Sequence, residues 1–281
     1  MKYVAASALL LFATAACSGS GPGAVSPPDA LAYKIPDNPT VIYVAESSQD
    51  ISVDIPGMGP MDMQGSSETT LSMTFAPAEG GMEVTTTFEK LSASMSNPMA
   101  GDITASESDI TGDLVFTMDE HGNGTLVSKP EIAQEVESMV GAAGLAYEFF
   151  PRLPGGAVEP GGTWTDTIQY EMEVAGGEAS SRSVVTYTMV GDTVVNGATL
   201  LHITYESDGE VVTHAVAQGT EMTQTFSGVT DGVFLWDPAR GLMVSHETTA
   251  ELDGATEVPS SGMPPFPMVI SARGSVRLQG G

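Results

Sequence analysis

Cysteine is nearly absent from this chain, since Cys17 is the single one among 281 residues. One cysteine cannot form a disulfide bond within a chain, so no disulfide framework supports the fold. Stability must come instead from buried apolar side chains. With 41% hydrophobic residues, the chain is long and apolar enough for one large domain or two small ones.

Basic residues are also scarce. The sequence has 9 lysines and arginines against 36 aspartates and glutamates, which gives a formal net charge of -27 at pH 7. A surface of this charge repels nucleic-acid phosphates and anionic lipid headgroups. We therefore predict that the protein binds no nucleic acid.

The sequence lacks the short motifs that mark common hydrolases and nucleotide-binding enzymes. It has no Gly-x-Ser-x-Gly, no Ser-x-x-Lys, no His-Glu-x-x-His and no glycine-rich phosphate loop that opens a helix. Its four histidines, at positions 121, 202, 214 and 246, show no metal-ligand spacing, and we interpret His246 as a half-buried structural residue. We predict a non-enzymatic protein with no catalytic residue, no metal and no cofactor.

The N-terminal residues have the pattern of an export signal. Lys2 precedes an apolar run over residues 4–13, which is too short to cross about 30 Å of hydrocarbon as a helix. The sequence Thr14-Ala15-Ala16-Cys17 then resembles a bacterial lipobox, in which the cysteine is acylated and becomes the first mature residue. We expect a lipoprotein signal peptide over residues 1–16, lipidation at Cys17 and a flexible Gly/Ser/Pro-rich tether over residues 17–39. A free thiol behind an ordinary cleaved signal is the alternative.

A lipid anchor at Cys17 would place the protein in the bacterial cell envelope, with the membrane as its partner. Ser18 follows the cysteine and resembles the outer-membrane address of proteobacterial lipoproteins. We therefore expect the periplasmic face of the outer membrane rather than the inner membrane.

From about Thr40 onward, short segments alternate apolar and polar residues. Ile51, Val53 and Ile55 alternate with polar neighbours, and the stretch from Trp164 to Val174 does the same, which is typical of strands with one buried face. Turn sequences separate the segments: His121-Gly122-Asn123-Gly124, Asn196-Gly197, Asp208-Gly209 and Asp237-Pro238-Ala239-Arg240-Gly241. We predict a mainly β domain over residues 40–281, with about eleven strands in one large antiparallel sheet. A sheet of that size must curl or close to protect its edges.

Residues 130–147 follow a different period. Apolar residues recur there mostly at spacings of three and four: Ile132, Val136, Met139, Val140 and Ala143. Pro130 suits a first helical turn, and Glu131 suits the positive end of the helix dipole. We predict one main helix, packed against the concave side of the curved sheet.

The order of these features resembles a known group. A lipobox, long hairpins, a helical insert, the passage PRLPGGAVEPGGTW (residues 151–164) and the turn FLWDPARGL (residues 234–242) are similar to uncharacterised bacterial lipoproteins related to the LolA/LolB and LppX/LprG half-barrels. The resemblance covers roughly residues 40–278. It implies an unclosed barrel, capped by the helix, whose apolar concave face can hold a lipid or another apolar molecule.

The stretch IPGMGPMDMQGSS, residues 55–67, places Met58, Met61 and Met63 close together. Thioethers at this spacing are able to bind Cu(I). However, the chain has 16 methionines, and others such as Met73 and Met82 fall on the buried faces of predicted strands. We therefore interpret the stretch as an apolar hairpin tip, in which methionine serves as a flexible hydrophobic side chain.

Residues 262–268 form a second apolar loop. Because exposed apolar loops usually mark a binding surface, we expect this loop and residues 55–67 to form the rim of a ligand cavity. The candidate ligand-binding residues are Met58, Met61, Met63, Met139, Trp164, Met263 and Phe266. The leading hypothesis is a membrane-anchored lipoprotein that binds a lipid or other apolar ligand in the concave face. The alternatives are a structural or protein-interaction lipoprotein whose core is filled by its own side chains, and, more remotely, Cu(I) binding. The sequence identifies no protein partner.

Overall fold

The computed structural model describes residues 31–57, 59–96, 98, 101–133, 136–174, 176–217 and 220–280. The predicted signal peptide, Cys17 and Met58 lie outside these residues. Within them, no helix has the length and apolar character needed to cross a membrane.

The described residues form strands, two short α-helices and two 3-10 turns. The strands are β1 (Thr40–Ile55), β2 (Gly59–Ala78), β3 (Gly81–Met95), β4 (Ile103–Ser106), β5 (Ile110–Thr111), β6 (Leu114–Met118), β7 (Gly124–Ser128), β8 (Glu131–Ile132), β9 (Thr163–Val174), β10 (Gly177–Val195), β11 (Ala198–Ala217), β12 (Thr220–Asp237), β13 (Leu242–Glu257) and β14 (Phe266–Leu278). The helices are α1 (Glu137–Val140) and α2 (Ala142–Glu148), and the 3-10 turns span Glu107–Asp109 and Pro259–Ser261.

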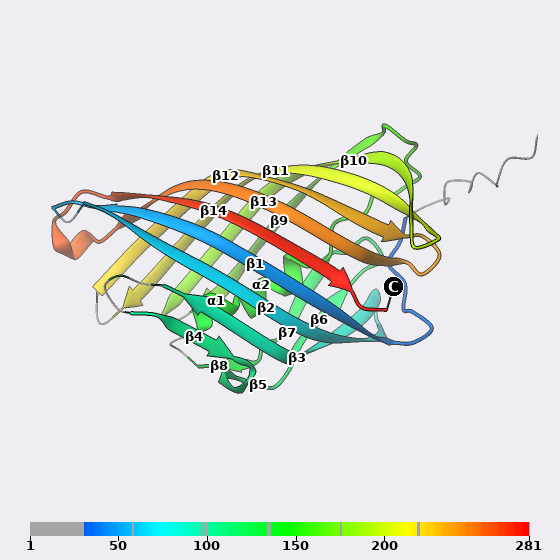
Figure 1. Ribbon diagram of the computed structural model, residues 1–281, viewed down its shortest axis with the longest axis horizontal. Coiled ribbons are helices and arrows are strands. Elements are labelled where there is room, and N and C mark those ends of the chain that lie inside the picture. Colours follow the sequence, from blue (N-terminus) through cyan, green and yellow to red (C-terminus); the bar gives the residue numbers. More distant parts are fainter. Residues whose placement is uncertain are drawn as a thin grey trace, which may run out of the picture.

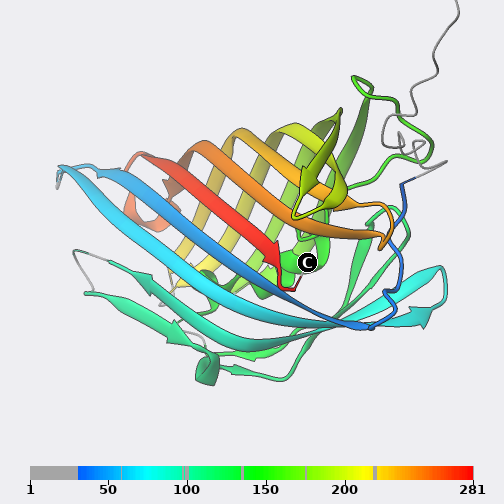
Figure 2. The ribbon, with the colours of Figure 1, turned by 45° about the vertical axis from the view of Figure 1, so that its right-hand side comes forward.

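Eleven strands follow one another in the main sheet, in the order β7-β6-β3-β2-β1-β14-β13-β12-β11-β10-β9, and β4 pairs with β3 beside this path. The pairs are antiparallel, for example β1 with β2 and β1 with β14. The sheet curls into a half-barrel that holds the helices on its concave side (Figures 1 and 2). The predicted mainly β fold, with a large curved antiparallel sheet and a helical segment inside it, is confirmed.

Two-residue alternation explains which side of each strand faces inward. In β1, Val41, Tyr43 and Val53 are buried while the residues between them are more exposed. Tyr43 lies opposite Leu71 of β2 and Leu278 of β14, and these side chains point to the same face. The apolar side chains of successive strands therefore form one continuous concave surface.

Glycines on the concave side let the sheet curve tightly. A Cβ atom on Gly232 would lie 2.4 Å from the ring of Tyr205, and one on Gly254 would lie 2.3 Å from the ring of Phe226. Each ring thus lies over the glycine on the neighbouring strand and covers it, a known device in curved sheets.

One end of the half-barrel is filled by aromatic and aliphatic side chains; we call it the base. Its largest fully buried residues include Tyr43, Phe116, Phe234 and Trp236, and Phe149 and Phe150 pack among them. Helix α2 contacts β6 and β7 on one edge of the sheet and β9 on the other. It therefore spans the opening between the two edge strands.

The segment before β1 belongs to the base, which corrects the predicted extent of the tether. Leu31 and Tyr33 are buried, and the Tyr33 hydroxyl donates a hydrogen bond of 2.8 Å to the carbonyl oxygen of Pro151. The Tyr33 ring also packs edge-on against Trp236, with a centroid distance of 4.6 Å. Residues from Leu31 onward are part of the packed structure, although the sequence predicted a tether up to residue 39.

The single helix predicted over residues 130–147 is wrong in its details. Glu131 and Ile132 form strand β8, which pairs with β5 and places Ile132 opposite Ile110. Gly141 adopts a left-handed conformation with φ of 56° and separates α1 from α2. Glycine adopts positive φ readily, and this conformation ends the first helix. The three- and four-residue spacing of the apolar residues continues across the break, so the spacing alone does not reveal it.

Candidate functional site

The concave face keeps an open cavity of about 370 Å³ beside the base. Its walls are residues of strands β9 to β13, most of them inward-facing, and its floor is formed by Phe150, Pro151 and Tyr187. The volume lies within the range of about 300–1,000 Å³ that is usual for small-molecule sites.

The apolar side chains of this wall are less buried than those of the base. Val211, Phe226 and Leu252 line the cavity and remain partly exposed, whereas Phe234, further toward the base on the same strand as Phe226, is fully buried. Partly exposed apolar side chains in a concave surface gain free energy when an apolar molecule covers them. The described side chains therefore leave this part of the concave face unfilled.

A carboxyl group lies within this largely apolar surface. Glu148, the last residue of α2, lines the cavity and accepts a hydrogen bond of 2.9 Å from the hydroxyl of Tyr170 on β9. The Tyr170 ring stacks on Tyr147 with a centroid distance of 4.4 Å and an interplanar angle of 2°. This stacking holds the hydroxyl in place beside the carboxylate.

The surroundings of Glu148 make its charged form less stable than it would be in water. The residue as a whole is exposed to solvent, but the protein atoms around its carboxyl group displace part of the surrounding water, and this desolvation raises the pKa of the carboxyl. The hydrogen bond from Tyr170 and the positive charge of Arg152 oppose the rise. Burial also raises the pKa of Tyr170, so its hydroxyl stays protonated and remains a donor.

His246 on β13 lines the cavity and is paired with a tyrosine. Its Nε2 atom is 2.7 Å from the hydroxyl oxygen of Tyr205, and both side chains line the cavity. Burial lowers the pKa of His246 to about 4, so the imidazole is neutral at neutral pH. The interpretation of His246 as a half-buried structural histidine is confirmed by its burial and its hydrogen bond.

We expect His246 to make the stability of the protein sensitive to acid. The unfolded chain protonates its histidine near its ordinary pKa of about 6.5, but the folded protein does so only near 4. The unfolded state thus binds more protons between these values, and stability falls as the pH drops through this window. The loss is at most about 3 kcal/mol, because the imidazole keeps some contact with solvent.

Urea unfolding of the native protein and of a His246→Gln variant at several pH values measures this effect. Glutamine can still hydrogen-bond to Tyr205 but does not titrate. The difference in unfolding free energy between the two proteins should change between about pH 7 and about pH 4. Parallel pH profiles for the two proteins would contradict the assignment.

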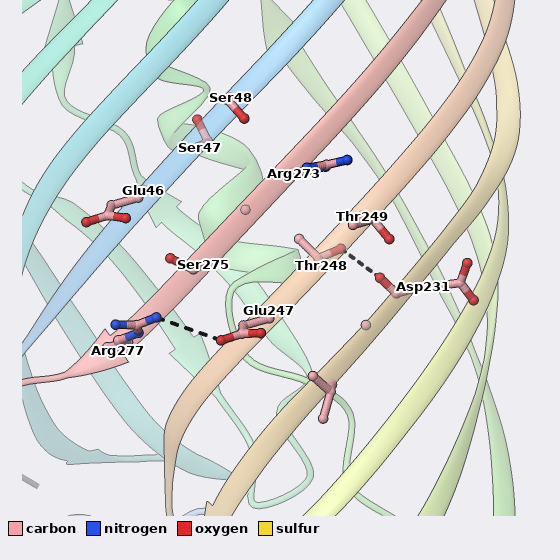
Figure 3. Close-up of a pocket in the computed structure, with 13 residues that line it drawn as sticks. Glu46, Ser47, Ser48, Asp231, Glu247, Thr248, Thr249, Arg273, Ser275 and Arg277 are labelled. Atoms are coloured by element: carbon pink, nitrogen blue, oxygen red, sulfur yellow. Dashed lines mark hydrogen bonds and ion pairs between the residues drawn. The ribbon is translucent and has the colours of Figure 1, made fainter.

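A second depression lies on the outer face of the sheet, across β1, β14, β13 and β12 (Figure 3). Its side chains include Glu46, Asp231, Glu247 and the two arginines Arg273 and Arg277. Arg277 forms an ion pair of 3.8 Å with Glu247, and both side chains are largely exposed. Val233 is the one apolar side chain among its lining residues, and the other side chains are charged or carry hydroxyl groups, so we regard the more apolar concave cavity as the candidate site.

The described candidate residues from the sequence do not line the cavity. Met61 and Met63 lie in β2 rather than in a hairpin tip, opposite Val53 and Ile51 of β1 on the concave face. Their pairing places them near the turn between β1 and β2. The Cu(I) alternative also needs Met58, which lies outside the described residues.

The remaining candidates occupy three separate places. Met139 of α1 packs against the small cluster that contains Leu91 and Val136. Trp164 stacks on Tyr187 at 5.1 Å, and its indole N–H donates to the carbonyl oxygen of Arg152. Met263 and Phe266 lie in and just after the connection between β13 and β14.

The sequence did not single out Glu148 or Tyr205. Glu148 is one of 36 acidic residues, and no local pattern separates it from the others. The one sequence feature that could have identified Glu148 is its position at the end of a helical segment, directly before the apolar residues Phe149 and Phe150. Among the described residues, no group of three or more His, Cys, Asp and Glu side chains is arranged to hold a metal ion.

No family model and no curated protein matches this chain. Crystal structures of OccAB2 from Acinetobacter baumannii and OpdQ from Pseudomonas aeruginosa are similar over 85% of this chain and 98% and 99% of theirs, with identities of 5% and 6% and TM-scores of 0.25 and 0.26. An outer membrane lipoprotein-sorting protein domain from Vibrio parahaemolyticus is 12% identical over 85% of this chain and 86% of its own, with a TM-score of 0.15. TM-scores this low establish neither a shared fold nor a shared function.

Proposed function

We propose that the protein is an exported, membrane-anchored lipoprotein of the bacterial envelope that binds an apolar ligand in its concave cavity and catalyses no reaction. The lipobox-like sequence at Cys17 supports the anchor and the location. The partly exposed apolar wall of the cavity carries the proposal of binding, because such a surface is stabilised by an apolar occupant.

The titratable groups of the cavity favour binding over catalysis. Glu148 is engaged with Tyr170, and His246 is engaged with Tyr205. A histidine whose pKa is about 4 is a weak base at neutral pH, which makes it a poor general base. These pairs instead position polar groups within an apolar surface, as ligand-binding cavities do.

A tryptophan at position 211 should block the cavity. Val211 lines the cavity from β11, and the larger ring would occupy the space that a ligand needs. We expect Val211→Trp to weaken binding of the neutral fluorescent probe N-phenyl-1-naphthylamine at least about tenfold. Fluorescence titration of the full chain measures the dissociation constant.

The next residue provides a matched control. Val212 pairs with Ser180 and Thr225 and so points to the outer face of the same strand. Val212→Trp adds the same ring without entering the cavity, and the probe should bind to it as to the native protein. Equal binding by the native protein and both variants, or no binding by any of them, would refute the proposed site.

A further inference from the structure

We infer that the ligand is an apolar molecule with one protonated amine, and that the amine binds at the Glu148 carboxylate. This inference rests on the proposed function and adds the chemical class of the ligand. Its basis is the carboxyl group of Glu148, which lines the cavity together with mostly apolar and hydroxyl-bearing side chains.

The charged groups around the cavity favour a cation. Glu148 and Glu210 are the carboxylates among the described lining residues, and these include no lysine or arginine. His246, also in the lining, is neutral at neutral pH because burial lowers its pKa to about 4. The formal net charge of -27 for the whole chain adds a negative potential that attracts cations and repels anions.

Arg152 is the positive group that acts on Glu148, and it does not line the cavity. Its side chain is buried, its Nη2 atom donates to the carbonyl oxygen of Tyr147, and its Nε atom lies 3.9 Å from an oxygen of Asp166. Arg152 is therefore directed toward Asp166 and the α2 backbone. It reduces the negative potential at Glu148 without occupying the ligand's position.

Desolvation explains why an amine is preferred over a neutral or anionic headgroup. Any ligand that fills the cavity removes water from Glu148, and an unpaired carboxylate without water is strongly destabilised. A neutral ligand requires Glu148 to take up a proton, and an anionic ligand adds repulsion. A protonated amine replaces the lost water with a charge-assisted hydrogen bond.

The geometry leaves an acceptor free for this bond. The Tyr170 hydroxyl binds to Oε1 of Glu148. A carboxylate has two oxygens with about four acceptor positions, so the ammonium group can bind while Tyr170 keeps its contact. Tyr170 then fixes the direction of the carboxylate toward the ligand.

Isothermal titration calorimetry with decylammonium, decanol and decanoate tests the inference, because the three probes share a chain and differ in headgroup charge. We expect decylammonium to bind most tightly and decanoate least. Glu148→Gln should weaken decylammonium binding about ten- to hundredfold, which is typical for the loss of a hydrogen bond to a charged group, and should leave decanol binding unchanged.

Glu206→Gln is the matched control. It makes the same charge change on β11, but residue 206 is exposed, does not line the cavity, and pairs with Thr186 and Asp231 at positions that face outward. This variant should bind all three probes as the native protein does, and circular dichroism would establish that both variants are folded. If all three probes bind equally to the native protein, or Glu148→Gln weakens decanol as much as decylammonium, the amine inference is wrong while the cavity remains a binding site. If none of the probes binds, the proposed function itself is wrong.

Discussion

Replacing Phe150 with alanine should destabilise the protein by about 3–5 kcal/mol, as expected for removal of a buried phenylalanine. The Phe150 side chain is 3% exposed and meets rings from several parts of the chain. Its centroid lies 4.9 Å from Phe149, 5.3 Å from Tyr33 and 6.1 Å from Phe75. It therefore joins the segment before β1, the segment after α2 and strand β2 in one packed base.

The size of this effect follows from the position of Phe150 among rings that come from separate segments of the chain. Removing the ring leaves a cavity that the curved strands cannot close without moving, so the lost contacts are not replaced. Domains are usually stable by only about 5–15 kcal/mol, so the variant should lose a large part of its stability. Urea denaturation monitored by circular dichroism measures the change.

A control at Val194 separates core packing from a general effect of shortening a side chain. Val194 lies in β10 with 69% of its side chain exposed, so Val194→Ala should change the unfolding free energy by no more than about 0.5 kcal/mol. A loss below about 1 kcal/mol for Phe150→Ala would show that the Phe150 ring is not tightly packed in the base.

The alternation of residues was enough to predict the sheet, because one-sided burial with a period of two is a property of each strand taken alone. Ile51 and Val53 face inward as predicted, and Asn196-Gly197 forms the expected turn, with positive φ at both residues. The curvature that turns this sheet into a half-barrel was predicted only in general terms. It depends on how glycines and rings of neighbouring strands, such as Gly232 and Tyr205, meet across the sheet.

The failures came where tertiary context overrode a local signal. Asp208-Gly209 was predicted as a turn, but both residues lie within β11, and Gly209 is opposite Gly228 on the concave face. A glycine serves equally in a turn and in a tightly curved strand, and only the pairing decides between them. Similarly, Ile132 fits a helical spacing but pairs with Ile110 in a strand.

The candidate site was less predictable than the fold. Apolar loops were expected to form the cavity rim, whereas the described cavity lies in the sheet and includes Glu148, His246 and Tyr205. These residues come from α2, β13 and β11, which are distant in the sequence. Their meeting depends on the order of strands in the sheet, which a single sequence does not specify.

Replacing Cys17 with alanine should move the protein from the membrane fraction to the soluble fraction of a bacterial host that acylates lipoproteins. Alanine has no thiol to acylate, and each methylene of an acyl chain buried in a bilayer contributes about 0.8 kcal/mol, so the anchored and unanchored forms should differ almost completely in partitioning. Cell fractionation and immunoblotting measure the distribution. An unchanged distribution would contradict the anchor.

The same variant also tests whether anchoring and binding are independent. The chain enters the described fold at the base, where Leu31 and Tyr33 are buried, and the cavity lies beyond the base on β9 to β13. The Cys17→Ala protein should therefore keep the fold, the urea midpoint and the probe affinity of the acylated protein, and should lose only its association with the membrane. If probe affinity falls together with membrane association, the acyl chains rather than the cavity hold the probe, and the site must be sought at the anchor. If affinity is retained in the soluble form, binding belongs to the half-barrel itself.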